Sequence, residues 1–152
     1  MVIQCLDIRK RVITNDNFKM KFNKYNERGS YHWDWYTDGC WYKELVDRNI
    51  KEFDKGSVLD IGCGDGLTTY LLKKKGLDVV GIDREGIDLA REKAPDCEFI
   101  STDISEYKPE KRFDYFLCQD VIEHLDNTEA LIKLFNEYCD NFMILSTDNP
   151  EG

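Results

Sequence analysis

The chain has 152 residues, of which 41% are hydrophobic and 34% charged, and its net charge is −9. This length and composition predict one soluble domain with a core of its own, and the longest apolar runs are too short to cross a bilayer. The acidic balance argues against broad, non-specific binding to nucleic acid.

The first 30 residues predict an N-terminal extension built as a β-hairpin. Val2–Thr14 and Phe18–Phe22 are strand-like, with a turn signal at Asn15–Asn17 between them. Residues 23–30 are polar and predict a loop. The segment up to residue 29 holds seven Lys or Arg residues against three acidic ones, and these charges either face water or contact an anionic partner. We therefore divide the chain into this extension, 1–30, and a second unit, 31–152.

Neither the N-terminus nor the cysteines indicate export. The first ten residues lack the uninterrupted apolar run of a secretory signal. None of the six cysteines belongs to a CxxC pair, which predicts free thiols and no zinc site. We expect a cytoplasmic protein.

From residue 31 onward, helical and extended patterns follow one another. The aromatic segment Tyr31–Tyr36 leads into Trp41–Phe53, whose apolar residues recur at helical spacing. Strands are then expected at Val58–Ile61, Asp78–Ile82, Cys97–Ser101, Phe113–Cys118 and Phe142–Ser146. Helices are expected at Leu67–Lys75, Ile87–Lys93 and Asn127–Cys139. This alternation predicts an α/β fold with a doubly wound, mainly parallel Rossmann-like sheet, which binds its ligand at the carboxyl ends of the strands.

The segment Val58–Gly66 carries the strongest functional signal, because a buried strand runs there into a glycine-rich loop. Gly62, Gly64 and Gly66 let the backbone approach a ligand and tolerate positive φ. Asp60 stands two residues before the first glycine, where its charge would repel a pyrophosphate and attract a cationic ligand. Loop and acid together predict S-adenosylmethionine, which carries a sulfonium and an ammonium group.

Polar residues also follow the next three strands, and the ends of parallel strands share one edge of a sheet. Asp83 can accept hydrogen bonds from both hydroxyls of a ribose, a device that NAD sites use as well. Asp103 can accept from an adenine amino group, with Ile104 against the ring, or it can cap a local turn. Gln119 follows the fourth strand.

The segments VLDIGCGDG, VVGID, STDI and FDYFLCQDVIEHL resemble, in order and spacing, the motifs of class I S-adenosylmethionine-dependent methyltransferases. The resemblance covers residues 55–148, and Trp33–Phe53 looks like the helix that covers the cofactor. It implies that the methionine part contacts Asp60, Gly62, Cys63 and Gly64. It further implies ribose contacts by Asp83 and Arg84, adenine contacts by Asp103 and Ile104, and a place for Gln119 near the transferred methyl group. Trp35 or Tyr36 could close over the sulfonium by cation–π attraction, or could pack against the next helix.

The stretch Asp120–His124 resembles the segment after the fourth strand in ubiquinone-biosynthesis-type O-methyltransferases and in small-RNA 3′-end methyltransferases. In the latter, an ExxEH pattern binds a divalent metal. Asp120, Glu123 and His124 could hold Mg²⁺ or Mn²⁺, or His124 could pack locally. We take His124 as the candidate catalytic residue, a base for a substrate hydroxyl, and keep the metal site as the alternative.

The family usually continues into two further strands at the sheet edge, whereas this sequence ends at Gly152, six residues after Ser146. Three explanations stay open. The chain is a fragment, or a minimal enzyme with an open acceptor site, or the N-terminal hairpin supplies the missing edge strands.

We therefore expect an enzyme that transfers a methyl group from S-adenosylmethionine to an oxygen or nitrogen of a small-molecule or sugar acceptor, mainly through proximity and alignment. The alternatives are a metal-assisted RNA methyltransferase and a catalytically inactive cofactor-binding or regulatory module. A nicotinamide-dependent dehydrogenase is disfavoured, because Asp60 is badly placed for a pyrophosphate.

Overall fold

In the computed structural model, which describes residues 24–147, parallel strands form a five-stranded sheet in the order β3–β2–β1–β4–β5. The strands are β1 (Ser57–Ile61), β2 (Asp78–Asp83), β3 (Glu98–Ser101), β4 (Phe113–Gln119) and β5 (Cys139–Ser146). The strand order reverses between β1 and β4, and doubly wound sheets bind their ligands at such a switch point. The expected α/β, Rossmann-like sheet is confirmed.

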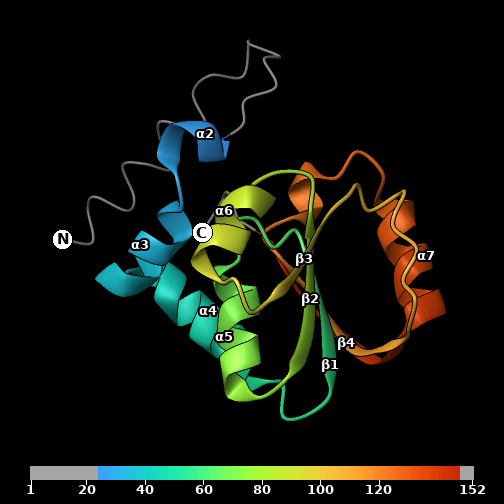
Figure 1. Cartoon of the computed structure of the whole chain (residues 1–152). Coiled ribbons are helices and arrows are strands. Elements are labelled where there is room, and N and C mark those ends of the chain that lie inside the picture. The colour runs from blue at the N-terminus through green and yellow to red at the C-terminus, as the bar shows by residue number, and fades with distance from the viewer. Residues whose placement is uncertain (1–23, 148–152) are drawn as a thin grey trace.

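Helices cover both faces of the sheet and make three layers. They are α2 (Lys24–Arg28), α3 (Tyr31–Asp38), α4 (Trp41–Lys51), α5 (Leu67–Lys75), α6 (Ile87–Lys93), the 3₁₀ turn η1 (Ile122–His124) and α7 (Thr128–Tyr138). Figure 1 shows α3 to α6 on one side of the sheet and α7 on the other. Among the described residues, no helix has the length and apolar character needed to span a membrane.

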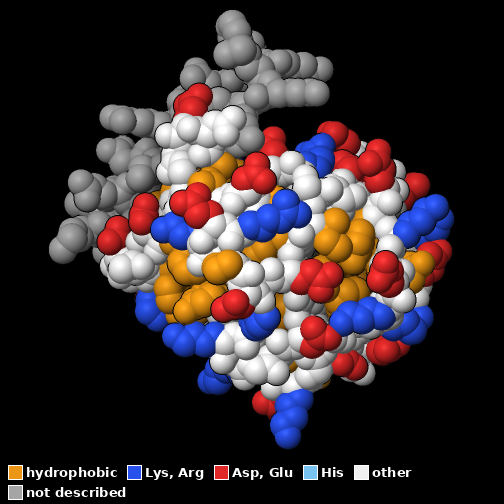
Figure 2. All heavy atoms as spheres, viewed as in Figure 1, with side chains coloured by type: hydrophobic (Ala, Val, Ile, Leu, Met, Phe, Trp, Pro, Cys, Tyr) orange, Lys and Arg blue, Asp and Glu red, His pale blue; other side chains and the backbone are white. Residues whose placement is uncertain are grey.

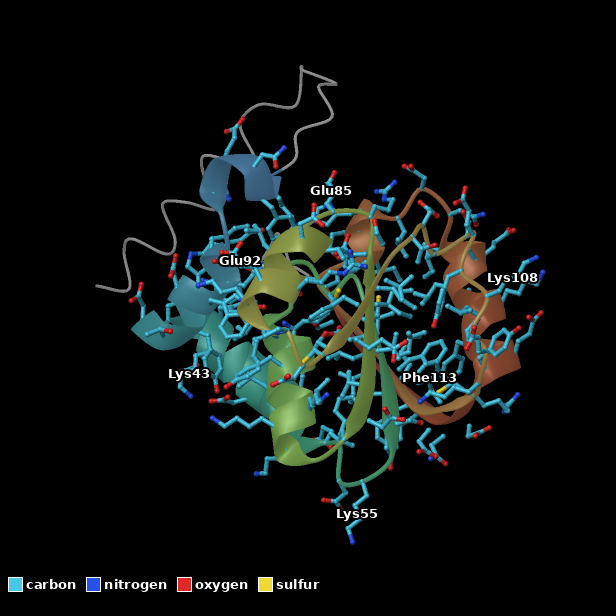
Figure 3. All side chains as sticks on the ribbon, in the orientation of Figure 1. Lys43, Lys55, Glu85, Glu92, Lys108 and Phe113 are labelled. Carbon is cyan, nitrogen blue, oxygen red and sulfur yellow. The ribbon has the colours of Figure 1, made fainter. Side chains whose placement is uncertain are left out.

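The side chains of β1 alternate between the two helical layers, as in any strand. Leu59 belongs to the cluster that includes Leu131 of α7, whereas Val58 packs in the cluster that includes Leu72 of α5. Asp60, two residues after Val58, therefore points to the α5 side. Phe113, labelled in Figure 3, belongs to the cluster on the α7 side.

The carboxyl ends of the strands gather at one edge of the molecule. Glu85, two residues after β2, marks this edge in Figure 3, and Lys55, just before β1, lies at the opposite end. The loops at the edge near Glu85 carry most of the residues for which the sequence predicts a function.

Two segments before β1 differ from the sequence prediction. The expected loop over residues 23–30 contains helix α2, in which Tyr25 is buried. A helix of five residues is not stable by propensity alone, so the tertiary packing of Tyr25 decides its conformation. The helix predicted from apolar spacing over Trp41–Phe53 is present as α4, Trp41–Lys51. The longer covering helix that the resemblance implies over Trp33–Phe53 is divided into α3 and α4, because Gly39 adopts a left-handed φ of 71° and ends α3.

The other end of the chain shows a smaller difference. The helix predicted to end at Cys139 ends at Tyr138, and β5 begins at Cys139 rather than at Phe142. The predicted hairpin over residues 2–22 lies outside the described residues. The division of the chain at residue 30, and the hypothesis that the hairpin completes the sheet edge, therefore remain predictions.

Candidate functional site

The glycine-rich loop connects β1 to α5 and turns sharply at the switch point of the sheet. The backbone N–H groups of Gly62 and Cys63 donate to the carbonyl of Ile82, at 2.8 and 3.1 Å. Gly62, Gly64 and Gly66 have φ values of 73°, 53° and 83°, a region in which side chains with a Cβ are strained. The glycines therefore stand where the turn requires them.

Asp83 fastens this loop to the end of β2. Its Oδ2 accepts a hydrogen bond of 2.8 Å from the N–H of Gly64, and its Oδ1 accepts one of 3.0 Å from the N–H of Glu85. A carboxylate oxygen has two lone pairs, so each oxygen retains one acceptor site for a ligand hydroxyl. The structure thus brings Asp83 to the loop, as the sequence predicts.

Asp60 is a buried acid with a partner inside the protein. Its Oδ2 accepts a 2.6 Å hydrogen bond from the hydroxyl of Thr69, in the first turns of α5. Burial raises the pKa of Asp60, the bond from Thr69 opposes this shift and the charge of Asp83 adds to it, so that the pKa is about 7. Asp60 therefore supplies an acid of unusual affinity for protons beneath the loop.

Three acids act together on the centre of the loop. The thiol of Cys63 is buried, and its pKa is raised well above the usual value first by that burial and then by the charges of Asp60, Asp83 and Asp65. A neutral, buried thiol packs like a small hydrophobe. The loop thus lies in a field of negative charge, which fits a cationic ligand and opposes a pyrophosphate.

Asp65 is a site residue that the sequence reasoning missed. It is 1% exposed, and its Oδ2 accepts a hydrogen bond from the N–H of His32 at 3.0 Å and lies 3.2 Å from Nδ1 of the same residue. The indole Nε1–H of Trp33 donates to the carbonyl of Asp65 at 2.9 Å. Asp65 therefore anchors α3 to the glycine loop. The signal in the sequence was an acid between Gly64 and Gly66, in a loop with little room for an unpaired charge.

Tyr25 of α2 closes over the same loop and was also missed, because its segment was expected to be a loop. A Cβ placed on Gly64 would lie 2.0 Å from the Tyr25 hydroxyl oxygen, and one on Gly86 would lie 2.9 Å from Cδ2 of the tyrosine ring. The ring of Tyr25 also stacks on Tyr31, with centroids 5.5 Å apart. The two glycines thus make room for an aromatic side chain that covers the loop.

Trp35 and Tyr36, which the sequence placed over a sulfonium or against the next helix, lie within the α3–α4 layer. Trp35 packs edge-on against Tyr31 and Tyr42, with centroids 4.8 and 5.7 Å away. The hydroxyl of Tyr36 donates a 2.7 Å hydrogen bond to Asp47, on the exposed side of α4. Both contacts fit the packing role.

Arg84 and Asp103 meet across the loops that follow β2 and β3. Nη1 of Arg84 lies 3.5 Å from Oδ2 of Asp103. The other carboxylate oxygen accepts from the N–H and the hydroxyl of Ser105, at 2.9 and 2.6 Å. These bonds lower the pKa of Asp103, with a smaller contribution from Arg84. Ile104 packs partly buried against the core cluster on the α7 side. Asp103 thus caps a local turn and keeps one oxygen directed to Arg84.

The end of β4 lies beside the glycine loop and is tied to α4. A Cβ on Gly62 would lie 2.2 Å from Cγ2 of Val121, so the chain after β4 passes directly over the first glycine. Oε1 of Gln119, the last residue of β4, accepts a 2.9 Å hydrogen bond from Nδ2 of Asn49. Asn49 was not singled out from the sequence, since nothing local marks a helical Asn as part of a site.

The triad Asp120, Glu123 and His124 does not converge in the structure. Oδ1 of Asp120 lies 3.4 Å from the Ser146 hydroxyl, and Oε2 of Glu123 accepts a 3.1 Å hydrogen bond from Thr147. The imidazole of His124 is 67% exposed, with Nε2 4.0 Å from Oε1 of Glu123. Between residues 24 and 147, no group of three or more acidic, His or Cys side chains is arranged to hold a metal ion.

Comparison with known proteins connects this site to a family. Residues 35–151 match the family model described as a methyltransferase domain. Among curated relatives, the ubiquinone biosynthesis O-methyltransferase of Rickettsia canadensis is 29% identical over 70% of this chain and 48% of its own length. The enzyme of the same name from Rickettsia felis is 31% identical over 70% of this chain and 47% of its own length. The chain therefore spans about half the length of these relatives.

Solved structures agree on the fold. A TehB-like SAM-dependent methyltransferase from Corynebacterium glutamicum superposes with a TM-score of 0.64 at 22% identity, over 76% of this chain and 67% of its own. A SAM-dependent methyltransferase from Archaeoglobus fulgidus gives 0.63 at 25% identity, over 79% and 59%. Because the family model covers most of the sequence and the sheet has the same architecture, the chain belongs to the methyltransferase domain family and has the class I, Rossmann-like fold.

Proposed function

We propose that the protein binds S-adenosylmethionine at the carboxyl edge of its sheet and transfers the methyl group to an oxygen or nitrogen of a small molecule. Three acids at the glycine loop carry this proposal: Asp83 accepts from the N–H of Gly64, Asp65 stands buried between Gly64 and Gly66, and Asp60 is buried at the end of β1. The charge of Asp65 and Asp83, and that of Asp60 once a nearby cation favours its ionised form, attracts the sulfonium and ammonium groups of this cofactor and repels the pyrophosphate of a dinucleotide. The relatives named above, which are methyltransferases, support the same reaction.

The chain offers a distinct group to each part of the cofactor. The remaining lone pairs of Asp83 suit the ribose hydroxyls, and the charge of Asp60 suits the ammonium group. We assign the adenine ring to Asp103 and Ile104, with Arg84 beside them, and the methionine backbone to Gly62, Gly64 and Gly66. Cys63 serves this site by packing tightly under the loop.

When bound, the cofactor supplies an activated methyl group: a lone pair of the acceptor forms the new bond to carbon while the carbon–sulfur bonding pair moves to sulfur, and the acceptor loses a proton. His124, in the turn after β4, is our candidate to take that proton. Helices α2 and α3, held by Tyr25 and Asp65, lie against the loop and would limit the access of water to it.

A small acceptor fits the surface better than a nucleic acid does. On the face seen in Figure 2, Lys and Arg side chains are interspersed with acidic ones and form no continuous stripe. A nucleic-acid groove requires clustered positive charge along the backbone of its ligand. The alternative of a metal-assisted RNA methyltransferase also lacks a converging triad among residues 24–147.

Calorimetric titration of the full chain with S-adenosylhomocysteine and with NAD tests the cofactor assignment. We expect S-adenosylhomocysteine to bind and NAD not to bind. Asp83→Ala should weaken binding by about tenfold or more, since it removes hydrogen bonds to a charged group. Asp83→Asn keeps an acceptor for Gly64 and controls for folding, and Asp88→Ala changes a fully exposed acid of α6. Binding of NAD alone would overturn the proposal.

A second measurement separates an enzyme from a binding module. Transfer of a labelled methyl group is followed from S-adenosylmethionine to a panel of small hydroxyl and amine compounds. Turnover of any member supports catalysis by the chain. Tight binding of S-adenosylhomocysteine, combined with no transfer across the panel, would assign the chain to the binding or regulatory alternative.

A further inference from the structure

Asn49 is a buried polar residue in the last turn of an amphipathic helix. It is 5% exposed and lies in α4, one turn after Val46, which is fully buried. An apolar side chain would be more stable at such a position, because a carboxamide loses its hydration on burial and Asn is a poor helix former. The contact that offsets this cost is the 2.9 Å hydrogen bond from its Nδ2 to Oε1 of Gln119.

Gln119 stands at the point where the two halves of the sheet meet the glycine loop. Its neighbour in β4, Cys118, pairs with Ile61, the residue immediately before Gly62. Two residues later, Val121 packs on Gly62 itself. Ser146, at the end of β5, pairs with Gln119 on the other side. Gln119 thus lies between the loop that we assign to the methionine part and the strand end beyond it.

The bond from Asn49 determines which end of the Gln119 carboxamide is available. A carboxamide has one oxygen that accepts and one NH₂ group that donates. With one lone pair of the oxygen engaged by Asn49, Gln119 keeps two N–H donors and a single acceptor lone pair, so donors predominate among the groups left for a ligand. Such a donor binds a hydroxyl oxygen, which keeps a second lone pair beside the one that attacks the methyl group. A neutral amine nitrogen has one lone pair, which the attack consumes, so it cannot accept this hydrogen bond at the same time.

We propose that Asn49 is a positioning residue for methyl transfer: it holds Gln119 as a hydrogen-bond donor toward the acceptor and thereby selects a hydroxyl or phenolic oxygen over an amine. This inference rests on the proposed function, since it refines the acceptor of the same site. The reaction it favours converts a hydroxyl to a methyl ether, with the hydroxyl proton passing to the base. The hydrogen bond between Asn49 and Gln119 also joins α4 to the end of β4, so the position of this helix and the orientation of the Gln119 side chain depend on each other.

The direction of the hydrogen bond can be tested without any ligand. Side-chain amide protons of the full-length, isotope-labelled chain are assigned by NMR with the help of Asn49→Asp and Gln119→Glu. We expect slow exchange with water for a proton of Asn49 and fast exchange for both protons of Gln119. Protection of Gln119 instead of Asn49 would overturn the inference, whether or not the protein binds the cofactor.

Variants then connect this bond to selectivity. In Gln119→Glu, the new carboxylate still accepts from Asn49 but cannot donate, so the preference for hydroxyl over the matched amine compound should fall by about tenfold. Asn49→Leu fills the same space without the bond and should lower kcat by a similar factor. Asn49→Leu should leave the affinity for S-adenosylhomocysteine within about twofold of the wild type, and Arg48→Leu, on the exposed side of α4, should change nothing.

The outcomes distinguish this inference from the proposed function. If wild-type protein does not bind S-adenosylhomocysteine, the proposed function fails and the NMR result still reports the direction of the bond. If it binds the cofactor and methylates amines faster than the matched hydroxyl compounds, the proposed function stands and the selectivity is wrong. Loss of cofactor affinity in Asn49→Leu would show a merely structural role and overturn the positioning role.

Discussion

The hydroxyl of Thr69 donates a 2.6 Å hydrogen bond to Oδ2 of Asp60, and both side chains are buried between β1 and α5. One neutral donor compensates only part of the cost of burying a carboxylate. The ionised form of Asp60 is therefore unfavourable, and the pKa of its carboxyl group is raised to about 7. A cationic group above the loop would stabilise the ionised form of Asp60. The charge of this residue would then affect both the stability of the fold and the binding of a cationic ligand.

The first prediction concerns pH. Because the pKa of Asp60 is raised from 3.8 to about 7 on folding, the folded state binds its proton more tightly than the unfolded state does. Stability from this group is therefore present below about pH 4 and is lost as the pH rises through about 7, by an amount on the order of a few kcal/mol. Urea unfolding of wild type and Asp60→Asn between about pH 5 and pH 8 should show this decline in the wild type only. Parallel curves for the two proteins would show that Asp60 has an ordinary pKa.

The second prediction concerns the contact between Gly64 and Tyr25. Gly64→Ala places a methyl group 2.0 Å from the Tyr25 hydroxyl and should displace α2, with a large loss of affinity for S-adenosylhomocysteine. Gly39→Ala is the matched control, because Gly39 has a similar φ of 71° but nothing within 4 Å of the added Cβ. In that control, the added backbone strain should lower the free energy of unfolding by about 1–2 kcal/mol, and the affinity for S-adenosylhomocysteine should not change. Equal affinities for the two variants would contradict the closure by Tyr25.

The third prediction concerns the anchor of α3. Asp65→Ala removes the acceptor for the N–H of His32, and this should cost about 1–3 kcal/mol of unfolding free energy and loosen α3. Amide hydrogen exchange should therefore accelerate in residues 31–38 while β1 and β4 stay protected. Asp34→Ala, an exposed acid on the same helix, is the control and should leave the exchange unchanged. Uniform acceleration over the whole domain would instead indicate that Asp65 supports the entire fold.

The fourth prediction compares two leucines on neighbouring strands. Leu117 of β4 is 0% exposed, whereas Leu145 of β5 is 41% exposed. Leu117→Ala leaves a cavity in the core and should lower the free energy of unfolding by about 2–5 kcal/mol. Leu145→Ala should cost less than about 1 kcal/mol in the same chain. A loss at Leu145 comparable to that at Leu117 would show that something covers β5 in solution.

Much of the fold and part of the site could be read from local sequence patterns. The strands predicted to begin at Val58, Asp78 and Phe113 are short, largely apolar runs between turn signals, and the observed strands agree with their bounds to within one residue. Asp60 and Asp83 could be found because each ends or nearly ends such a run, and parallel strands bring their ends to one edge. Asp120, Glu123 and His124 did not converge, because Asp120 adopts a left-handed φ of 52° and the chain turns there toward Ser146. The spacing of these three residues in the sequence does not indicate that turn.

The sequence by itself determined that the chain forms a Rossmann-like sheet with a glycine loop among acids, since these features depend on periodicity and on residues close together in the chain. The tertiary structure decided how that loop is covered and which side chains from distant parts of the chain lie beside it. Tyr25 lies against Gly64. His32 binds Asp65, 33 residues away in the sequence, and Asn49 binds Gln119, 70 residues away. Such contacts depend on how α2, α3 and α4 pack on the sheet, and that packing is fixed by the shape and burial of whole elements, which no local pattern encodes.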